Sequence, residues 1–332
     1  MTNETKNLKI DLVYMWVDGK DPAWIKKKSM YDEKLATLSK EVVSECRYFD
    51  NEELRFSLRS VEKYAPWINH IYIITDNQVP VWLNTKHEKI TIIDHSQIMP
   101  SEVLPCFSSP ALECGLANIP NLSEHFIYQN DDMLFFQPVS PDFFFTPSGD
   151  PIVRLRRRTL LYYRLKKHSN YAFRVYRTIQ RIQNDYGTCY PMSPHHCADA
   201  YRKSTFLACL AKYKSLVDET LAHRFREQND IQRSLMSLYA LETKQAALHW
   251  VHKFNRTNGF WAKLRSFITG NYTYDSVHLH INTKDYSRAL KRTNPVLLCL
   301  NDSHRSTNAD RVRAHAFLQQ TFPVPSAFEV NA

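Results

Sequence analysis

Five continuous apolar runs, each followed at once by acidic or amide residues, limit the fold of this chain more than any other feature. The runs end at Asp18, Asp76, Asp94, Asn130-Asp131-Asp132 and Asn301-Asp302. Unbroken hydrophobicity is typical of strands that are covered on both faces of a sheet. Sheets of this kind bind ligands at the carboxyl ends of their strands. The sequence therefore predicts an α/β fold with a mainly parallel sheet and a polar site at one edge.

Asp131 and Asp132 are the first candidates for a metal site. Two acids at a strand end can hold Mg²⁺ or Mn²⁺, which prefer oxygen ligands. A strand-end loop whose acids meet only water is the alternative, because loops are rich in aspartate. Asn301 and Asp302 follow another apolar strand, and adjacent parallel strands would bring both polar ends to one edge. This arrangement favours the metal site.

An amphipathic helix is predicted between the first two strands. Asp50 or Asn51 is a suitable N-cap, and Pro66 lies just past the expected end. Its apolar face comprises Leu54, Leu58 and Val61, and a charged stripe comprises Glu52, Arg55, Arg59 and Glu62. For an ordinary helix, such a stripe indicates a salt-bridged face in solvent.

Residues 154–181 contain ten basic residues and no acid, interleaved with aromatic side chains. We expect one catalytic domain over residues 1–332, with a basic helical insertion at about residues 152–250. Such a segment can contact nucleic acid, an anionic membrane or a polyanionic polymer, and a solvated helix is an equal alternative. The net charge of +9 also favours an anionic partner without identifying it.

The composition excludes several classes of protein. The chain has seven cysteines and no C-x-x-C pair, so a zinc ribbon or disulfide framework is not expected and a reducing compartment is favoured. It has six glycines and no glycine-rich phosphate loop, zinc-protease helix or nucleophile elbow. It shows no signal-peptide core and no apolar stretch long enough for a membrane span. We therefore expect a cytoplasmic protein, at most peripheral to the membrane.

His195 and His196 are candidates for a general base. An imidazole titrates near neutrality, so a histidine pair in a loop after Pro194 can accept a proton from a substrate. A surface histidine is the alternative, because the chain has 14 of them. Lys203 follows closely and could neutralise a phosphate or only begin a helix.

Four stretches together resemble the Stealth family. "IDLVYMWVDGKDPAW" resembles its first region, and "RYFDNEELRFSLRSVEKYAPWINHIYIITDNQVPVWLN", continuing to "LSEHFIYQNDDMLFF", resembles its second. "HHCADAYRKS" and "LCLND" are similar to the third and fourth regions. The family contains bacterial capsule and surface-polysaccharide phosphotransferases and the animal enzyme that begins the mannose-6-phosphate tag. The resemblance implies a nucleotide-sugar transferase (GT-A-like) α/β sandwich with an inserted basic helical region.

The resemblance also implies a reaction and its participants. Family members transfer a sugar 1-phosphate, such as a hexose or N-acetylhexosamine 1-phosphate, from a UDP-sugar to a sugar hydroxyl and release UMP. The expected partners are the UDP-sugar, an oligo- or polysaccharide acceptor that is free or lipid-linked, and Mg²⁺ or Mn²⁺, with no nucleic acid. Contact with the inner face of the membrane is compatible with this assignment. The rivals are a metal-dependent glycosyltransferase that releases UDP and a non-catalytic polyanion-binding protein.

Roles for individual residues follow from the resemblance. The expected base is His196, with His195 second, and the expected catalytic arginines are Arg55 and Arg59. The expected substrate-binding residues are Asp18, Gly19, Arg47, Asn51, Glu52 and Lys203, and the expected metal ligands are Asp131, Asp132, Asn301 and Asp302. Because phosphoryl transfer needs little covalent participation by the protein, these residues are expected to act by positioning and charge stabilisation.

Overall fold

The main sheet of this protein is mostly parallel, as the sequence predicts. The computed structural model describes residues 8–31, 45–157, 170–188, 192–251, 274–291 and 293–330. In this part of the chain the sheet has the order β3-β2-β1-β4-β8. Its strands are β1 (Ile10–Met15), β2 (Ile71–Thr75), β3 (Ile90–Asp94), β4 (His125–Asn130) and β8 (Asp199–Arg202). The pairings among β1 to β4 are parallel, and β8 runs antiparallel to β4.

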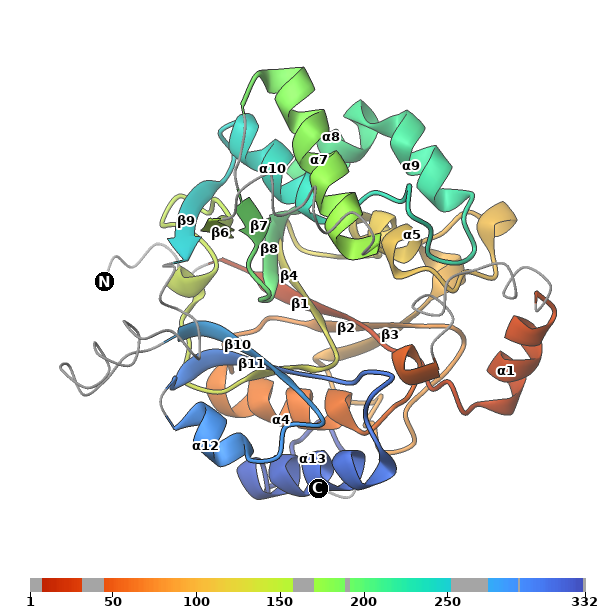
Figure 1. The fold of residues 1–332 in the computed structure, drawn as a ribbon, viewed down its shortest axis with the longest axis vertical. Helices are drawn as coiled ribbons and strands as arrows, with labels where there is room; N and C mark the ends of the chain where they lie inside the picture. The colour runs from red at the N-terminus through yellow and green to blue at the C-terminus, as the bar shows by residue number, and fades with distance from the viewer. Residues whose placement is uncertain are drawn as a thin grey trace.

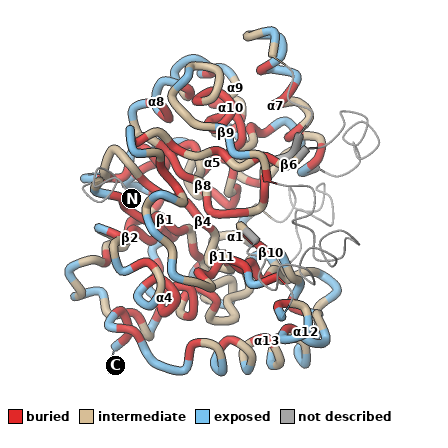
Figure 2. Tube along the Cα trace, turned by 90° about the vertical axis from the view of Figure 1, so that its left-hand side faces the viewer, coloured by how far each residue is buried: buried red, intermediate tan, exposed pale blue. Residues whose placement is uncertain are grey.

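Both faces of this sheet are buried, which explains the unbroken apolar runs. In β1, Val13 packs into the core on one face, whereas Leu12 and Tyr14 pack into the core on the other. In β4, Phe126 packs into the same core as Val13, and Ile127 packs into the same core as Leu12 and Tyr14. Successive side chains of a strand point to opposite faces, so a strand covered on both sides is apolar at most positions. The buried Asp11 of β1 is an exception, and it accepts hydrogen bonds from Asn69 and Ser123. Figure 2 shows buried residues concentrated along these central strands.

A second sheet continues directly from the first. It has the order β10-β11-β5, with β10 (Tyr274–His280) parallel to β11 (Pro295–Asn301) and β11 antiparallel to β5 (Met133–Phe135). Only Asp131 and Asp132 separate β4 from β5. The two aspartates therefore form the turn by which the chain passes from one sheet to the other.

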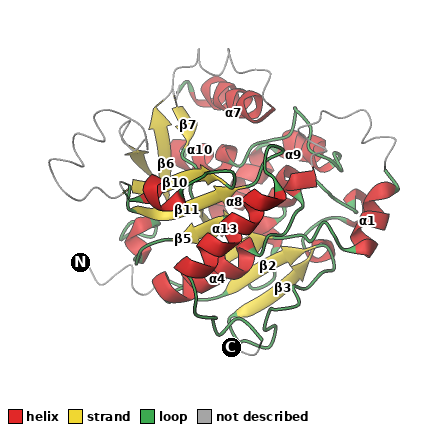
Figure 3. Cartoon of the chain, turned by 60° about the horizontal axis from the view of Figure 1, so that its bottom comes forward, coloured by secondary structure: helices red, strands yellow, loops and turns green. Residues whose placement is uncertain are grey.

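Helices cover the main sheet on both sides (Figures 1 and 3). On one side α4 (Glu53–Tyr64) packs on the main sheet, whereas α12 (Tyr286–Leu290) and α13 (Asn308–Thr321) pack on the second sheet. The other side has α5 (Ser109–Cys114), α7 (Asn170–Tyr186), α8 (Lys203–Lys212), α9 (Lys214–Leu221) and α10 (Ser234–Glu242), while α1 (Pro22–Ser29) lies at the edge. Short 3₁₀ helices are formed by Glu45–Arg47, His95–Gln97, Ser101–Val103, Leu116–Asn118 and Pro141–Phe143. No helix in the described ranges is long and apolar enough to cross a membrane.

The region expected as a helical insertion has a mixed structure. It contains helices α7 to α10, but β6 (Ile152–Arg157) forms where the basic helix was expected to begin. This strand joins β7 (Met192–Pro194) and β9 (Ala247–Val251) in a third sheet, and β8 belongs to the main sheet. Backbone pairing with β7 and β9 therefore overrides the local pattern of charges at β6. Residues 158–169 lie outside the described part of the chain.

The predicted helix between β1 and β2 is α4, but its start differs from the expectation. Leu54, Leu58 and Val61 are buried as predicted. The cap position is Glu52, whose backbone is left-handed with φ of 64°, rather than Asp50 or Asn51. Asp50 instead accepts a hydrogen bond from the Glu52 backbone at 2.9 Å, which forms a turn before the helix.

Candidate active site

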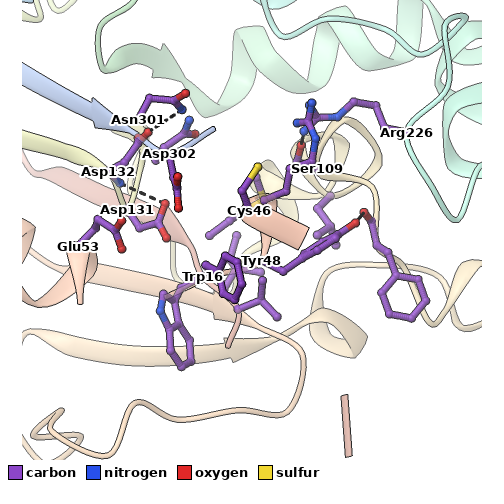
Figure 4. Close-up of a pocket in the computed structure, with 18 of the residues that line it drawn as sticks. Trp16, Cys46, Tyr48, Glu53, Ser109, Asp131, Asp132, Arg226, Asn301 and Asp302 are labelled. Carbon is purple, nitrogen blue, oxygen red and sulfur yellow. Dashed lines mark hydrogen bonds between the residues drawn. The ribbon is translucent and has the colours of Figure 1, made fainter. Parts of the chain in front are cut away.

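A cavity of about 430 Å³ opens at the carboxyl ends of β1 and β4. Its polar and aromatic lining includes Trp16, Trp24, Arg47, Tyr48, Glu53, His95, Phe107, Asn130, Asp131, Asp132, Arg226, Asn301 and Asp302. In Figure 4 the acidic side chains lie at one end of the cavity, and Arg226 and Ser109 lie at the other. The site therefore forms at the edge of the sheet where the sequence predicts it.

Asp131 and Asp132 lie at the acidic end with Glu53 and Asn301. The Asp132 backbone N–H donates to Asp131 Oδ1 at 3.1 Å. Asp132 Oδ2 accepts from Asn301 Nδ2 at 3.2 Å and lies 3.4 Å from the Cys299 thiol. Asp132 Oδ1 is buried and has no hydrogen-bond partner within the described residues. A buried carboxylate oxygen without a partner is costly unless a cation binds it.

The ionised forms of Asp131 and Glu53 are disfavoured in the absence of a cation. Burial raises the pKa of Asp131 well above its ordinary value, and the nearby Asp132, Glu53 and Asp50 raise it further. Burial likewise raises the pKa of Glu53 to about 7, and Asp50 adds to this rise. Several buried carboxylates that repel one another are a suitable ligand set for a hard divalent cation.

Asn301 and Asp302 reach the acidic end by a route that differs from the expectation. Strand β11 is not a parallel neighbour of β4; it pairs antiparallel with β5 in the second sheet. Asn301 directs its amide N–H groups to Asp132, which leaves its oxygen as a potential ligand. Asp302 forms an ion pair with Arg311 at 2.9 Å and accepts the Ser303 backbone N–H at 2.6 Å. The negative charge of Asp302 is therefore already balanced by Arg311, which makes Asp302 the weaker candidate ligand.

The opposite end of the cavity is basic and aromatic. Arg226 donates to Ser109, and its pKa falls to about 10 because of burial and the nearby Arg47 and Arg174. Two arginines held close together favour binding of an anion between or beside them. Trp24 lies 4.9 Å from the Tyr48 ring and 5.6 Å from the Phe107 ring, between centroids. This aromatic wall can accept a flat ring or a sugar face.

Two family models match this chain. The model described as Stealth protein CR1, conserved region 1, matches residues 8–36, and Stealth protein CR2, conserved region 2, matches residues 47–153. The exopolysaccharide phosphotransferase cps2G of Lactiplantibacillus plantarum is 33% identical over 265 residues, which are 71% of this chain and 76% of that protein. The chain belongs to the Stealth family. The resemblance found in the sequence is thereby confirmed, and this Stealth protein is a transferase enzyme.

Two further comparisons are more partial or more distant. The capsular polysaccharide phosphotransferase cps1A of Actinobacillus pleuropneumoniae is 36% identical over 232 residues, or 69% of this chain and 64% of that protein. The solved galactosyltransferase LgtC, in complex with donor and acceptor sugar analogues, aligns with 96% of each chain at 9% identity and a TM-score of 0.41.

Gly19 and Asp18 of this Stealth protein lie outside the cavity lining and form hydrogen bonds with residues near it. The Gly19 N–H donates to the Tyr48 carbonyl at 2.8 Å, and a Cβ atom at position 19 would lie only 2.4 Å from that oxygen. Only glycine allows this approach, which fixes the Tyr48 backbone beside the cavity. Asp18 does not line the cavity; its backbone exchanges hydrogen bonds of 3.1 and 3.0 Å with the Gln78 side chain.

Arg55 and Arg59 contact the C-terminal segment instead of the cavity. Both bind the buried Glu329 carboxylate, each at 2.6 Å. Arg59 is only 5% exposed and also donates to the Phe322 carbonyl at 2.7 Å. The two arginines of the α4 stripe thus face Glu329 instead of the cavity, whereas Glu62 is exposed.

Three other predicted substrate contacts are also used elsewhere. Asn51 donates to both oxygens of the Glu53 carboxylate, each at 2.7 Å, and so supports a residue of the cavity without lining it. Glu52 pairs with His315 at 2.8 Å. Lys203 begins α8, where its backbone N–H donates to Glu124 at 2.8 Å, outside the cavity lining. Of the six expected substrate-binding residues, Arg47 alone lines the cavity.

The two candidate bases have different surroundings. His195 is buried, and its ring nitrogens lie 3.1 Å from Arg156 Nη2 and 3.0 Å from Ser276 Oγ. Burial, reinforced by Arg156, lowers the pKa of His195 to about 3. Because a guanidinium only donates, the nitrogen facing Arg156 is an acceptor and the other nitrogen carries the proton. Both ring nitrogens of His195 are therefore engaged in hydrogen bonds, which leaves His196 as the better candidate.

His196 lies behind the acidic end of the cavity. Its Nε2 is 3.0 Å from Cys299 Sγ, and that thiol is 3.4 Å from Asp132. Burial and the neighbouring His278 lower the pKa of His196 well below its ordinary value, so its ring is neutral at pH 7. A neutral imidazole is the form that accepts a proton, although His196 does not line the cavity itself.

Sequence reasoning missed several residues of the site. Glu53 belongs to the start of the expected helix, which gives no sign of a role in the site. His95 directly follows the strand-end Asp94, so its position is a usable signal. Arg226 lies in a stretch without a recognisable pattern and reaches the cavity beside Phe225, which packs against Trp24 and Phe107. The aromatic wall was likewise not predictable from spacing, because Trp24 and Phe107 are far apart in the chain.

The described part of the basic segment is held by internal contacts. Arg174 is buried, Arg177 donates to Asn229 at 2.9 Å, and Arg181 pairs with Asp185 at 3.0 Å along α7. These arginines stabilise the packing around α7, so the described helix offers little free positive charge. A role for this segment in membrane or polymer contact stays a prediction.

Proposed function

We propose that this protein transfers a hexose 1-phosphate or N-acetylhexosamine 1-phosphate from a UDP-sugar to a sugar hydroxyl. The product is a phosphodiester in a capsule or cell-surface polysaccharide, and UMP leaves. Membership of the Stealth family supports the proposal, as do relatives named exopolysaccharide and capsular polysaccharide phosphotransferases. A cytoplasmic location, with peripheral membrane contact, is part of the proposal.

One observation carries the proposal: a single cavity joins an acidic end to a basic and aromatic end. A nucleoside diphosphate-sugar has matching parts, with two phosphates between a flat base and a sugar. Asp131, Asp132 and the Asn301 oxygen fit Mg²⁺ or Mn²⁺, as the orphan Asp132 Oδ1 indicates. Such an ion, when bound, supplies positive charge that offsets the diphosphate.

Side chains of this protein supply the charge stabilisation and the proton acceptor that the reaction also requires. The acceptor oxygen forms a bond to the β-phosphorus, the bond from that phosphorus to the bridging oxygen breaks, and UMP leaves with the electron pair. Arg226 and Arg47 stabilise the charge on the phosphate oxygens. The acceptor proton passes to the neutral imidazole of His196. The anomeric carbon does not react, so the sugar keeps its donor configuration.

Incubation with a panel of UDP-sugars, an oligosaccharide acceptor and Mg²⁺ tests the proposal. We expect UMP together with a phosphodiester ³¹P resonance, no turnover after chelation, and recovery when Mg²⁺ or Mn²⁺ is added. UDP without a phosphodiester would instead indicate the glycosyltransferase. Polymer binding without turnover for any donor would indicate the polyanion-binding protein.

A further inference from the structure

Behind Asp132, three side chains from separate elements present nitrogen and sulfur atoms to one point. His196 lies between β7 and β8, His278 is on β10, and Cys299 is on β11. One ligand atom from each lies within 4.8 Å of the others. His278 and Cys299 are direct partners in the pairing of β10 with β11. The backbone therefore holds two of the three groups in register.

The chemistry of this cluster differs from that of the acidic end of the cavity. Mg²⁺ selects oxygen ligands, whereas imidazole nitrogen and thiolate sulfur select Zn²⁺ and similar borderline ions. We propose that His196, His278 and Cys299 form a second cation site, specific for Zn²⁺ over Mg²⁺. Three protein ligands with an open fourth position are a common arrangement for zinc.

Two neighbouring features support this assignment. The Asp132 carboxylate lies 3.4 Å from Cys299 Sγ, so its negative charge stabilises a cation bound at the cluster. The side chain of His278 is exposed, which gives an ion a path from solvent, whereas Cys299 is fully buried. His278 also lies against the His196 ring, with 4.9 Å between centroids. A modest adjustment of the exposed His278 would bring all three ligands to bonding distance of one ion.

The proposal has a regulatory consequence, which rests on the proposed function. Zn²⁺ would occupy the imidazole of His196, the group assigned to accept the acceptor's proton. Bound zinc should therefore inhibit transfer without displacing Mg²⁺ from the acidic end. The binding site itself does not depend on this consequence, because zinc affinity is measurable without turnover.

Titration of the purified full chain with Co²⁺ or Cd²⁺, in excess Mg²⁺, tests the site directly. Both ions give charge-transfer absorption when a thiolate binds them. Displacement of the bound ion by Zn²⁺ then gives the affinity of the site for Zn²⁺. We expect one zinc-displaceable ion per chain bound through sulfur. His278→Ala should weaken that binding roughly 10–100-fold or more, since loss of outer-shell partners alone has an effect of this size. Cys299→Ser should remove the charge-transfer band.

Two controls keep the test specific. His280→Ala changes the next outward histidine of β10, whose ring is 4.9 Å from His278 but which is outside the cluster, and should keep the band. Cys46→Ser removes a partly exposed thiol at the cavity and should also keep it. His278 is exposed, so its alanine variant should fold even if the buried Cys299→Ser variant does not.

Three results would overturn the zinc site. They are a band that survives His278→Ala at unchanged affinity, the absence of any sulfur-bound ion in the wild type, and stoichiometric displacement of the ion by Mg²⁺. The last result would mean that the cluster belongs to the Mg²⁺ site. If zinc binds as expected but the protein shows no transfer with any UDP-sugar, the proposed function fails while the zinc site stands.

Discussion

Asp131 and Asp132 are placed by the backbone more than by their own side chains. They occupy the turn between β4 and β5, and the Leu300 N–H on β11 donates to the Asp132 carbonyl at 2.9 Å. On the other side, Ser57 of α4 donates to the Met133 carbonyl at 2.6 Å. Two carboxylates fixed between buried elements cannot separate to relieve their repulsion, so a cation is the simplest compensation.

Asp132→Asn should leave the protein folded but lower Mg²⁺-dependent turnover roughly 10²-fold or more, on the scale of losing one transition-state charge contact. Asparagine keeps an oxygen for Asn301 but loses the charge that binds the ion. Steady-state rates with and without added Mg²⁺ measure the effect, and thermal unfolding checks the fold. The surface variant Asp218→Asn is the matched control. Turnover by Asp132→Asn at the wild-type rate would exclude this carboxylate from the metal site.

Glu53 predicts a pH dependence of stability. Its pKa is about 7 in the folded state and 4.5 ordinarily, so the folded protein binds the extra proton between these values. The free energy of unfolding of the metal-free protein should therefore fall as pH rises from about 5 to about 7, by on the order of 2 kcal/mol from this group. Asp131, whose pKa is also raised, changes stability in the same direction.

Urea unfolding at several pH values in the presence of a chelator measures this fall. Glu53→Gln cannot ionise, so its stability should vary less with pH than that of the wild type. Added Mg²⁺ should recover stability at high pH in the wild type, because the ion binds the ionised carboxylates. Equal slopes for the wild type and Glu53→Gln would show that Glu53 is not the titrating group.

At the scale of elements, α4 connects the chain end to the catalytic edge. Its serines bond β5: Ser57 donates to Met133, and Ser60 accepts the Phe135 N–H at 2.9 Å. On another face, Arg55 and Arg59 hold Glu329, whose pKa falls to about 2 mainly because Arg59 and the Ser326 N–H offset the cost of burial. Glu329 therefore stabilises the fold above about pH 4.5, and this contribution is lost as pH falls towards 2.

Glu329→Gln should lower the free energy of unfolding at pH 7 by about 3 kcal/mol or more, because it leaves Arg59 buried without a counter-charge. Arg55→Ala, at a side chain that is 29% exposed, should cost about 1 kcal/mol or less. Denaturant unfolding compares the two variants, and turnover of the folded fraction should stay near that of the wild type. Loss of turnover in a stable Arg55→Ala protein would restore the phosphate contact expected from the sequence.

At the scale of the whole molecule, the sequence predicts the sheet well and the site only in part. The strands were predictable because burial on both faces leaves a continuous apolar pattern, and strand ends in such a sheet gather at one edge. The acidic turn at Asp131-Asp132 was predictable for the same reason. Arg59 was assigned wrongly because nothing local indicates that Glu329, 270 residues further on, covers it.

Other parts of the site depend on contacts that a sequence pattern does not encode. Arg226 and Phe107 reach the cavity from distant loops, and the β6 strand forms through pairing with β9, nearly a hundred residues away. The cluster of His196, His278 and Cys299 likewise joins three segments that share no motif. Long-range packing of this kind decides which polar residues meet, whereas hydrophobic periodicity decides only which segments form the sheet.

The central claim is that phosphorus moves together with the sugar, and a donor labelled at the β-phosphorus tests it most directly. In a UDP-sugar labelled there with ³²P, attack on the β-phosphorus carries the label into the polysaccharide and leaves unlabelled UMP. Attack on the anomeric carbon instead leaves the label in UDP. We predict label in the polymer, in a linkage that survives phosphomonoesterase treatment. Label found only in the released nucleotide would contradict the account.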